Sequence, residues 1–273
     1  MHRAFVATVT TLATAITALV TTVGLAAPGS AIVGGQPDTA HPNVGVLLPS
    51  AAMPVARWCG VTPLSPTVVV MAGHCAAFRK ANLGETDGDI TFDPRFIDSL
   101  GDKASGWAYT GSHPTYHGTL AAHPLYNPHG SGYDVAVMVL DVPITGLDIE
   151  SLPSAGLLDD LKAAGTLKEQ PLTLVGFGTT DRLPGNVYLG GGYRQTADQA
   201  LQSLGDAIVK HKGVDGSSVC TGDSGSPLFV GDQLVAVLSA GDAACSALSV
   251  SARLDVPAVR SWLLAQVAAA GAA

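Results

Sequence analysis

The hydrophobic positions of this chain fall into short runs rather than into long periodic stretches. Runs such as "NVGVLLP", "TVVVMAG", "DVAVMVLD", "LTLVGFG" and "QLVAVLSAG" are rich in valine and leucine and are separated by Gly, Pro, Asn and Ser. Such runs are typical of β-strands bounded by turns. Because they are not regularly followed by the long amphipathic helices that a parallel sheet needs, the pattern favours antiparallel sheets or barrels.

Two segments depart from this strand pattern. The stretch "VPAVRSWLLAQVAAA" near the C-terminus places apolar residues at helical spacing after an early proline. It predicts a helix that docks an apolar stripe on the body of the protein. The central stretch "DVPITGLDIESLPSAG" is rich in turn residues and poorly periodic, which makes it the candidate linker.

The N-terminus has the pattern of a secretion signal. Arg3 is followed by a long apolar run that is interrupted by threonines and ends in small residues. We expect residues 1–31 to be a signal peptide, whose last residues could form a very short propeptide. We expect the mature protein to be secreted and extracellular. The alternative is a retained membrane anchor, because the run is long enough to span a bilayer. After signal removal we expect no membrane association.

Composition narrows the function further. A chain of 273 residues with 47% hydrophobic and 13% charged residues can bury a large core, enough for one large domain or two small ones. The balance of 14 basic and 22 acidic residues gives a net charge of −8, which would repel a polyanion. Nucleic acid is therefore not an expected partner.

The four cysteines indicate disulfide bonds, since an even number in an exported chain is typical of such bonds. Three pairings are possible. The nearest-neighbour pairing, Cys59 with Cys75 and Cys220 with Cys245, closes loops that are each worth about 3 kcal/mol in the chain-entropy model. Zinc is the alternative, but no cysteine pair has the short spacing that zinc ligands favour. We expect no metal and no cofactor.

Three polar residues at the edges of strand runs suggest nucleophilic catalysis. His74 ends "VVVMAGHC", Asp134 opens "DVAVMVL", and Ser224 lies within "CTGDSGSP". A serine hydroxyl needs a base to take its proton, and an imidazole needs a carboxylate to fix its tautomer. The flanking glycines Gly222 and Gly225 allow a tight turn, in which the N–H groups of Gly222 and Ser224 can converge on an oxyanion.

These motifs, together with "IVGG", "WCG", "HPLYN", "GFG" and "LSAG" in this order, resemble the trypsin/chymotrypsin-type serine endopeptidases. The resemblance spans nearly all of residues 32–273. It implies an all-β fold of two six-stranded antiparallel β-barrels with a C-terminal α-helix. The N-terminal barrel would occupy residues 32–145, the C-terminal barrel and helix residues 146–273, and the active site the cleft between them.

The resemblance also assigns roles to single residues. It implies a catalytic triad of His74, Asp134 and Ser224, with an oxyanion hole formed by the N–H groups of Gly222 and Ser224. Both nearest-neighbour disulfides fall where the family has them. The substrate backbone would pair, as an added strand, with a segment made of Ser239, Ala240 and Gly241.

Activation follows from the same resemblance. Asp223 would pair with the new α-amino group of Ile32 after cleavage, and this pair would order the loop that carries Ser224. The residue before Ile32 is Ala31, where a trypsin-like activator would not cut. Either signal peptidase cuts after "GSA", or it cuts near Ala27 and leaves "PGSA" for another protease.

Substrate preference rests on the residue six positions before the nucleophile, Ser218, which in the family lies at the base of the specificity pocket. An uncharged floor has no partner for Lys or Arg, so we expect cleavage after apolar or aromatic residues. Gly241 would leave the entrance open, and Ser249 is a candidate for the opposite wall. We expect a monomer that acts on polypeptides, with a proteinaceous inhibitor as an open possibility.

Two other classes compete with this interpretation. A catalytically silent binding protein could keep the fold, although such proteins usually lose a triad residue and this chain keeps all three. A lipase or esterase is disfavoured because "GDSGS" does not fit the G-x-S-x-G elbow and the histidine precedes the serine. The acidic stretch "ETDGDITFD" lacks the ligand order of the known calcium loop, so we expect a solvated acidic loop there.

Overall fold

The computed structural model describes residues 32–272, apart from residues 54, 56, 131, 184–186, 243 and 247. The predicted signal peptide, residues 1–31, therefore lies outside the described residues.

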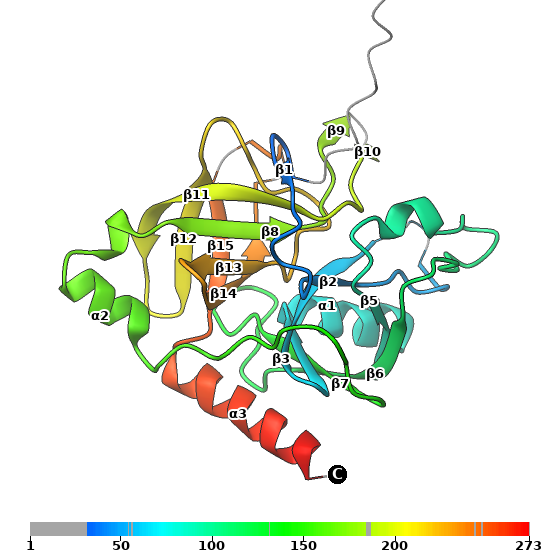
Figure 1. The fold of residues 1–273 in the computed structure, drawn as a ribbon, viewed down its shortest axis with the longest axis horizontal. Helices are drawn as coiled ribbons and strands as arrows, with labels where there is room; N and C mark the ends of the chain where they lie inside the picture. Colours follow the sequence, from blue (N-terminus) through cyan, green and yellow to red (C-terminus); the bar gives the residue numbers. More distant parts are fainter. Residues whose placement is uncertain are drawn as a thin grey trace, which may run out of the picture.

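The first barrel is closed by six antiparallel strands (Figure 1). In spatial order they are β2 (Gly45–Leu47), β3 (Cys59–Ser65), β4 (Val68–Met71), β7 (Ala136–Leu140), β6 (Thr115–Ala122) and β5 (Asp87–Thr91). The pairing of β2 with β5 closes the ring.

The second barrel also closes through six antiparallel strands. In spatial order they are β11 (Gln195–Leu204), β12 (Ile208–Gly213), β15 (Leu248–Arg253), β14 (Gln233–Ala240), β13 (Pro227–Val230) and β8 (Leu172–Gly176), and the pairing of β8 with β11 closes the ring. The short strand β1 (Gln36–Pro37), near the start of the described chain, adds to β11. A hairpin is formed by β9 (Asp181–Leu183) and β10 (Val187–Leu189).

The described chain has few helical segments. The α-helices are α1 (Gly73–Phe78), α2 (Leu157–Ala163) and the terminal α3 (Pro257–Gly271), and the shorter turns are η1 (Arg79–Leu83), η2 (Phe96–Ser99) and η3 (Leu167–Glu169). The predicted C-terminal helix is thus present. Its residues Val259 and Leu263 are buried, and the helix contacts β4 and β7 of the first barrel. The C-terminal end of the chain therefore packs against the first barrel.

The unbroken apolar run of β4 has a simple structural reason. Val68 and Val70 belong to a buried cluster that draws residues from both barrels and α3. Val69 and Met71 alternate with them and belong to a separate cluster inside the first barrel. Because successive strand residues point to opposite faces, a strand that is covered on both faces must be apolar throughout. The shared cluster packs the barrels side by side, as Figure 1 shows.

Candidate active site

His74 is placed by the junction of β4 and α1, in the first turn of the helix. Its backbone N–H donates to Asp134 Oδ1 at 2.7 Å, and its ring Nδ1 lies 2.8 Å from Asp134 Oδ2. Since a carboxylate oxygen can only accept, Nδ1 carries the proton and donates it. Nε2 of the neutral ring therefore has a free lone pair, which is the arrangement that a general base requires.

Asp134 is buried just before β7 and accepts a third hydrogen bond, from Ser239 Oγ at 2.6 Å. Sequence reasoning gave Ser239 only a role in substrate pairing. The missed contact joins residues that are 105 positions apart, on different barrels. The only local signal for it is a hydroxyl at the end of the apolar strand β14. With three donors, Asp134 is fixed against both His74 and the second barrel.

The residue before Asp134, Tyr133, has a φ of 61°, in the left-handed region that a bulky residue seldom adopts. Its ring stacks on His123 at 5.3 Å, and His123 in turn meets Trp262 of α3 edge-on at 4.9 Å. The histidine of "HPLYN" thus helps to clamp the turn that delivers Asp134. We infer that this packing supports the strained backbone beside the site.

Ser224 lies in a turn between Cys220 and β13 that is held from both barrels. The N–H of Gly60 donates to the Ser224 carbonyl at 2.7 Å, and the N–H of Gly225 donates to the Leu238 carbonyl at 2.8 Å. Gly222 has a φ of 99°, and a Cβ at this position would lie 2.5 Å from Trp58 Nε1. Only glycine fits this conformation and this contact.

The structure brings Ser224, His74 and Gly222 to one cleft of about 640 Å³. In the described part of the chain no hydrogen bond links the Ser224 and His74 side chains, a contact that often tightens only when substrate is bound. Within the same part of the chain, the N–H groups of Gly222 and Ser224 donate to no protein acceptor. Both donors are thus available to a ligand oxygen.

Asp223 is fully buried behind this turn. Its carboxylate accepts the N–H of Gly178 at 2.7 Å and that of Cys220 at 2.9 Å. Burial raises the pKa of Asp223 to about 7, and these hydrogen bonds offset only part of that effect. A buried acid without an opposite charge is a site that a cation would stabilise.

Ile32, the other half of the predicted ion pair, is also fully buried, in the apolar cluster of the second barrel. Here its nitrogen is an amide that donates to Gln195 Oε1 at 3.0 Å, so it carries no charge to pair with Asp223. The next residue, Val33, exchanges two backbone hydrogen bonds with Ser218, at 3.1 and 2.9 Å. The segment is thus docked beside the loop that leads to Asp223, and the ion pair stays a prediction.

The predicted substrate-binding residues lie on neighbouring segments. Ser218 is buried, with its hydroxyl bonded to the Val219 carbonyl at 3.3 Å. A Cβ at Gly241 would lie 2.7 Å from Val219 Cγ2, so this glycine packs too closely on Val219 to carry a side chain without a shift. Ala240 is the last residue of β14 and is exposed. Ser249, on β15, is buried, and its Oγ has no hydrogen-bond partner among the described residues.

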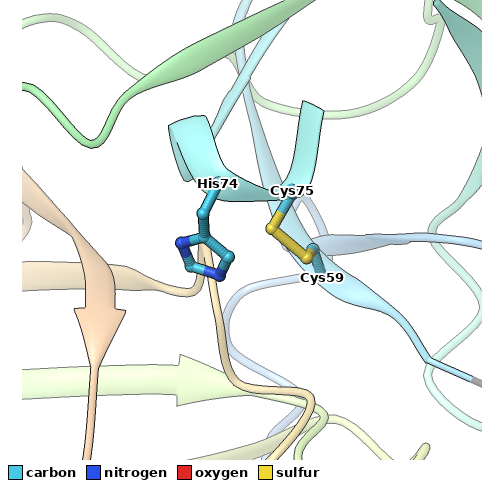
Figure 2. A group of neighbouring side chains, drawn as sticks. All are labelled: Cys59, His74 and Cys75. Carbon is cyan, nitrogen blue, oxygen red and sulfur yellow. A yellow bond between two sulfur atoms is a disulfide. The ribbon is translucent and has the colours of Figure 1, made fainter. Parts of the chain in front are cut away.

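Two disulfide bonds are present, Cys59–Cys75 and Cys220–Cys245. Figure 2 shows the first of them beside the ring of His74. These two sulfurs and an imidazole nitrogen of His74 lie within 4.8 Å of one another. This group does not fit a metal, because the sulfurs are bonded to each other and thiolates are the ligands that metals bind. The second disulfide anchors the turn that carries Ser224.

The acidic stretch after α1 contacts a cationic side chain of the protein itself, Arg79. The guanidinium of Arg79 is buried, donates to the Asp87 carbonyl at 3.1 Å and lies 3.6 Å from Glu85 Oε2. Its other contacts include the carbonyl of Leu48. Glu85 is therefore not simply solvated, as a loop of free acids would be.

Comparison with known proteins agrees with this architecture. The sequence profile named Trypsin matches residues 32–263. The chain is 26% identical to a trypsin of Saccharopolyspora erythraea over 77% of this chain and 87% of that protein. It is 27% identical to trypsin theta of Drosophila melanogaster over 85% of each chain, and 24% identical to a chymotrypsin-like serine proteinase of Haliotis rufescens over 86% of this chain and 91% of that protein. The chain belongs to the trypsin family of serine proteases.

Proposed function

We propose that this chain is a secreted serine endopeptidase that uses His74, Asp134 and Ser224. The observation that carries the proposal is the double hydrogen bond from His74 to Asp134, beside a cleft that Ser224 also lines. In this mechanism His74 Nε2 takes the proton of Ser224 Oγ as that oxygen attacks the peptide carbonyl. His74 then gives the proton to the leaving amine, and water hydrolyses the acyl-enzyme by the reverse sequence.

The N–H groups of Gly222 and Ser224 would stabilise the oxyanion of this reaction. Their lack of protein acceptors among the described residues supports the role. Loss of one such donor lowers kcat about 100- to 1000-fold in enzymes of this kind. Since the turn conformation of Gly222 is reserved for glycine, substitution there should disturb the oxyanion hole more than it disturbs His74.

Activation would occur when the chain is cut before Ile32. The new ammonium group could then pair with the carboxylate of Asp223, which burial otherwise disfavours in its charged form. The burial of Ile32 and the pairing of Val33 with Ser218 support this route, because they bring the segment close to the loop.

The preference for apolar or aromatic residues before the scissile bond remains part of the proposal. Its support is Ser218, which is uncharged and buried and so offers no partner for the charge of Lys or Arg. Secretion rests on the sequence of residues 1–31. None of the helices in the described part of the chain has the length and hydrophobicity needed to span a bilayer.

A peptide library tests the proposal. The protein that starts at Ile32 is incubated with peptides of varied sequence, and the cut sites are read by mass spectrometry. We expect cleavage mainly after Phe, Tyr, Leu or Met, and none by the matched variant Ser224→Ala. Cleavage mainly after Lys or Arg would refute the predicted preference. Peptide binding without any cleavage would favour the silent binding protein.

A further inference from the structure

We propose that the chain also selects its substrate on the leaving-group side, where Phe78 favours a large apolar residue directly after the scissile bond. This inference rests on the proposed protease function and concerns the same cleft. The cleft of about 640 Å³ begins at His74, Gly222 and Ser224 and extends away from them over α1. It is therefore continuous with the place where the bond would be cut.

The position of the cleft identifies which half of the substrate it would hold. Among the described residues that line it, none belongs to the segment Ser239 to Gly241 or to Ser218, where the acyl half is expected. The leaving amine takes its proton from His74 and so departs on the His74 side. His74, Cys59 and Cys75 all line the cleft, and Figure 2 shows the disulfide beside the His74 ring. The residue after the bond therefore enters it.

The lining is mainly apolar. Trp58, Leu47 and Met53 contribute to it, together with the disulfide beside His74. Phe78, the last residue of α1, lines the cleft and remains 36% exposed, although a phenylalanine gains from burial. A large apolar side chain of the substrate would cover this ring, whereas glycine would not.

The wall that carries Phe78 is fixed by the residue that follows it. Arg79 is only 3% exposed, and its guanidinium joins η1 to the carbonyls of Asp87 and Leu48 and to the carboxylate of Glu85. Ala81, two residues further on, also lines the cleft and is exposed. Because a preorganised wall loses little entropy on binding, it can discriminate between side chains.

Acyl transfer tests the proposal separately from the acyl side of the substrate. The chain starting at Ile32 is acylated by one peptide ester, and water and an added amino-acid amide then compete for the acyl-enzyme. The amine attacks the carbonyl, a peptide bond forms, and Ser224 Oγ leaves with the proton that His74 returns. We expect phenylalanine or leucine amide to capture the acyl group at least 10-fold better than glycine amide.

Variants locate this preference. Phe78→Ala should lower the ratio of phenylalanine to glycine capture toward one, because the covering ring is lost. Ala81→Phe, at an exposed position in the cleft lining, should narrow the cleft and shift capture toward small amides. Val142→Ala, a matched truncation of an exposed apolar residue elsewhere, should keep the wild-type ratio.

Two outcomes would overturn the inference. Equal capture of phenylalanine and glycine amides by a chain that hydrolyses the ester would overturn this inference alone and leave the protease function standing. A chain that starts at Ile32 yet forms no acyl-enzyme would overturn both.

Discussion

The interiors of the two barrels differ, although each is closed by six strands. The buried cluster inside the first barrel is apolar and includes Met71, Ile90 and Met138. The second barrel also buries a connected polar group contributed by β11, β12 and β15. His211 Nδ1 lies 2.8 Å from Gln199 Oε1, and His211 Nε2 lies 2.8 Å from Ser251 Oγ.

Because of this difference, we expect the stability of the two barrels to depend differently on pH. The first barrel holds His74 and Asp134 on an apolar core. The second barrel holds Ser224 next to the fully buried Asp223, whose pKa burial raises to about 7, and elsewhere in this barrel burial lowers the pKa of His211 to about 4. A change of pH near 7 should therefore alter the charge of the Asp223 carboxyl next to Ser224.

The largest effect is expected from a substitution that breaks the contact between Asp134 and the base His74. Asp134→Asn should lower kcat about 10⁴-fold, because an amide can donate to Nδ1 and so favours the wrong tautomer of His74. Ser239→Ala removes only one donor to the same carboxylate and should have a much smaller effect. Steady-state hydrolysis of one peptide, with circular dichroism as a folding control, compares the two. Equal losses would contradict the proposed role of Asp134 in fixing the tautomer of His74.

The next effect probes the apolar interior of the first barrel. Met138→Ala should lower the free energy of unfolding by about 2 to 5 kcal/mol, since Met138 is fully buried and the change leaves a cavity. Urea denaturation at several pH values measures it. The loss should be the same at each pH, because no charge is involved. A pH-dependent loss would show that this core is coupled to a titrating group.

In the second barrel, the Asp223 carboxyl should make the free energy of unfolding depend on pH. A folded pKa of about 7, against the ordinary aspartate value of 3.8, means that the folded state binds more protons between these pH values. Stability should thus fall as pH rises from about 4 to 7, by up to about 1.4 kcal/mol per pH unit from this group. The uncut chain with Ser224→Ala, which prevents self-cleavage, is compared with the same chain carrying Asp223→Asn.

The difference in unfolding free energy between these two chains should fall as pH rises. This pH dependence should be weaker in a chain that starts at Ile32, where an ammonium group can pair with Asp223. Parallel pH curves for the two uncut chains would contradict the assigned pKa. An unchanged slope after cutting would count against the ion pair.

The smallest expected effect concerns His211. Its folded pKa of about 4, against the ordinary histidine value of 6.5, comes from burial, so between these pH values the folded state keeps the ring neutral. Stability should fall as pH decreases from about 6.5 to 4. His211→Gln, which can keep one hydrogen bond, should remove this acid sensitivity. His129→Gln, at an exposed histidine, is the matched control and should leave it in place. Identical curves for wild type and His211→Gln would refute the assignment.

The sequence predicted the barrels and the terminal helix well because strand periodicity and family motifs are local signals. The run "VVVM" indicated a buried strand, but it could not say that Val70 faces the other barrel while Met71 faces the interior. The polar contacts were harder. Ser239 meets Asp134, and Gln195 meets the nitrogen of Ile32, across 105 and 163 residues. Such pairs depend on how the barrels close, which no local pattern encodes.

Whether Ser224 is an activated nucleophile can be measured from the intact mass of the chain that starts at Ile32, before and after treatment with a serine-directed fluorophosphonate. We predict one adduct, located at Ser224 by peptide mapping and absent in Ser224→Ala. A chain of this length that gains no adduct, or gains one at another residue, would contradict the claim that residues from both barrels form one active site.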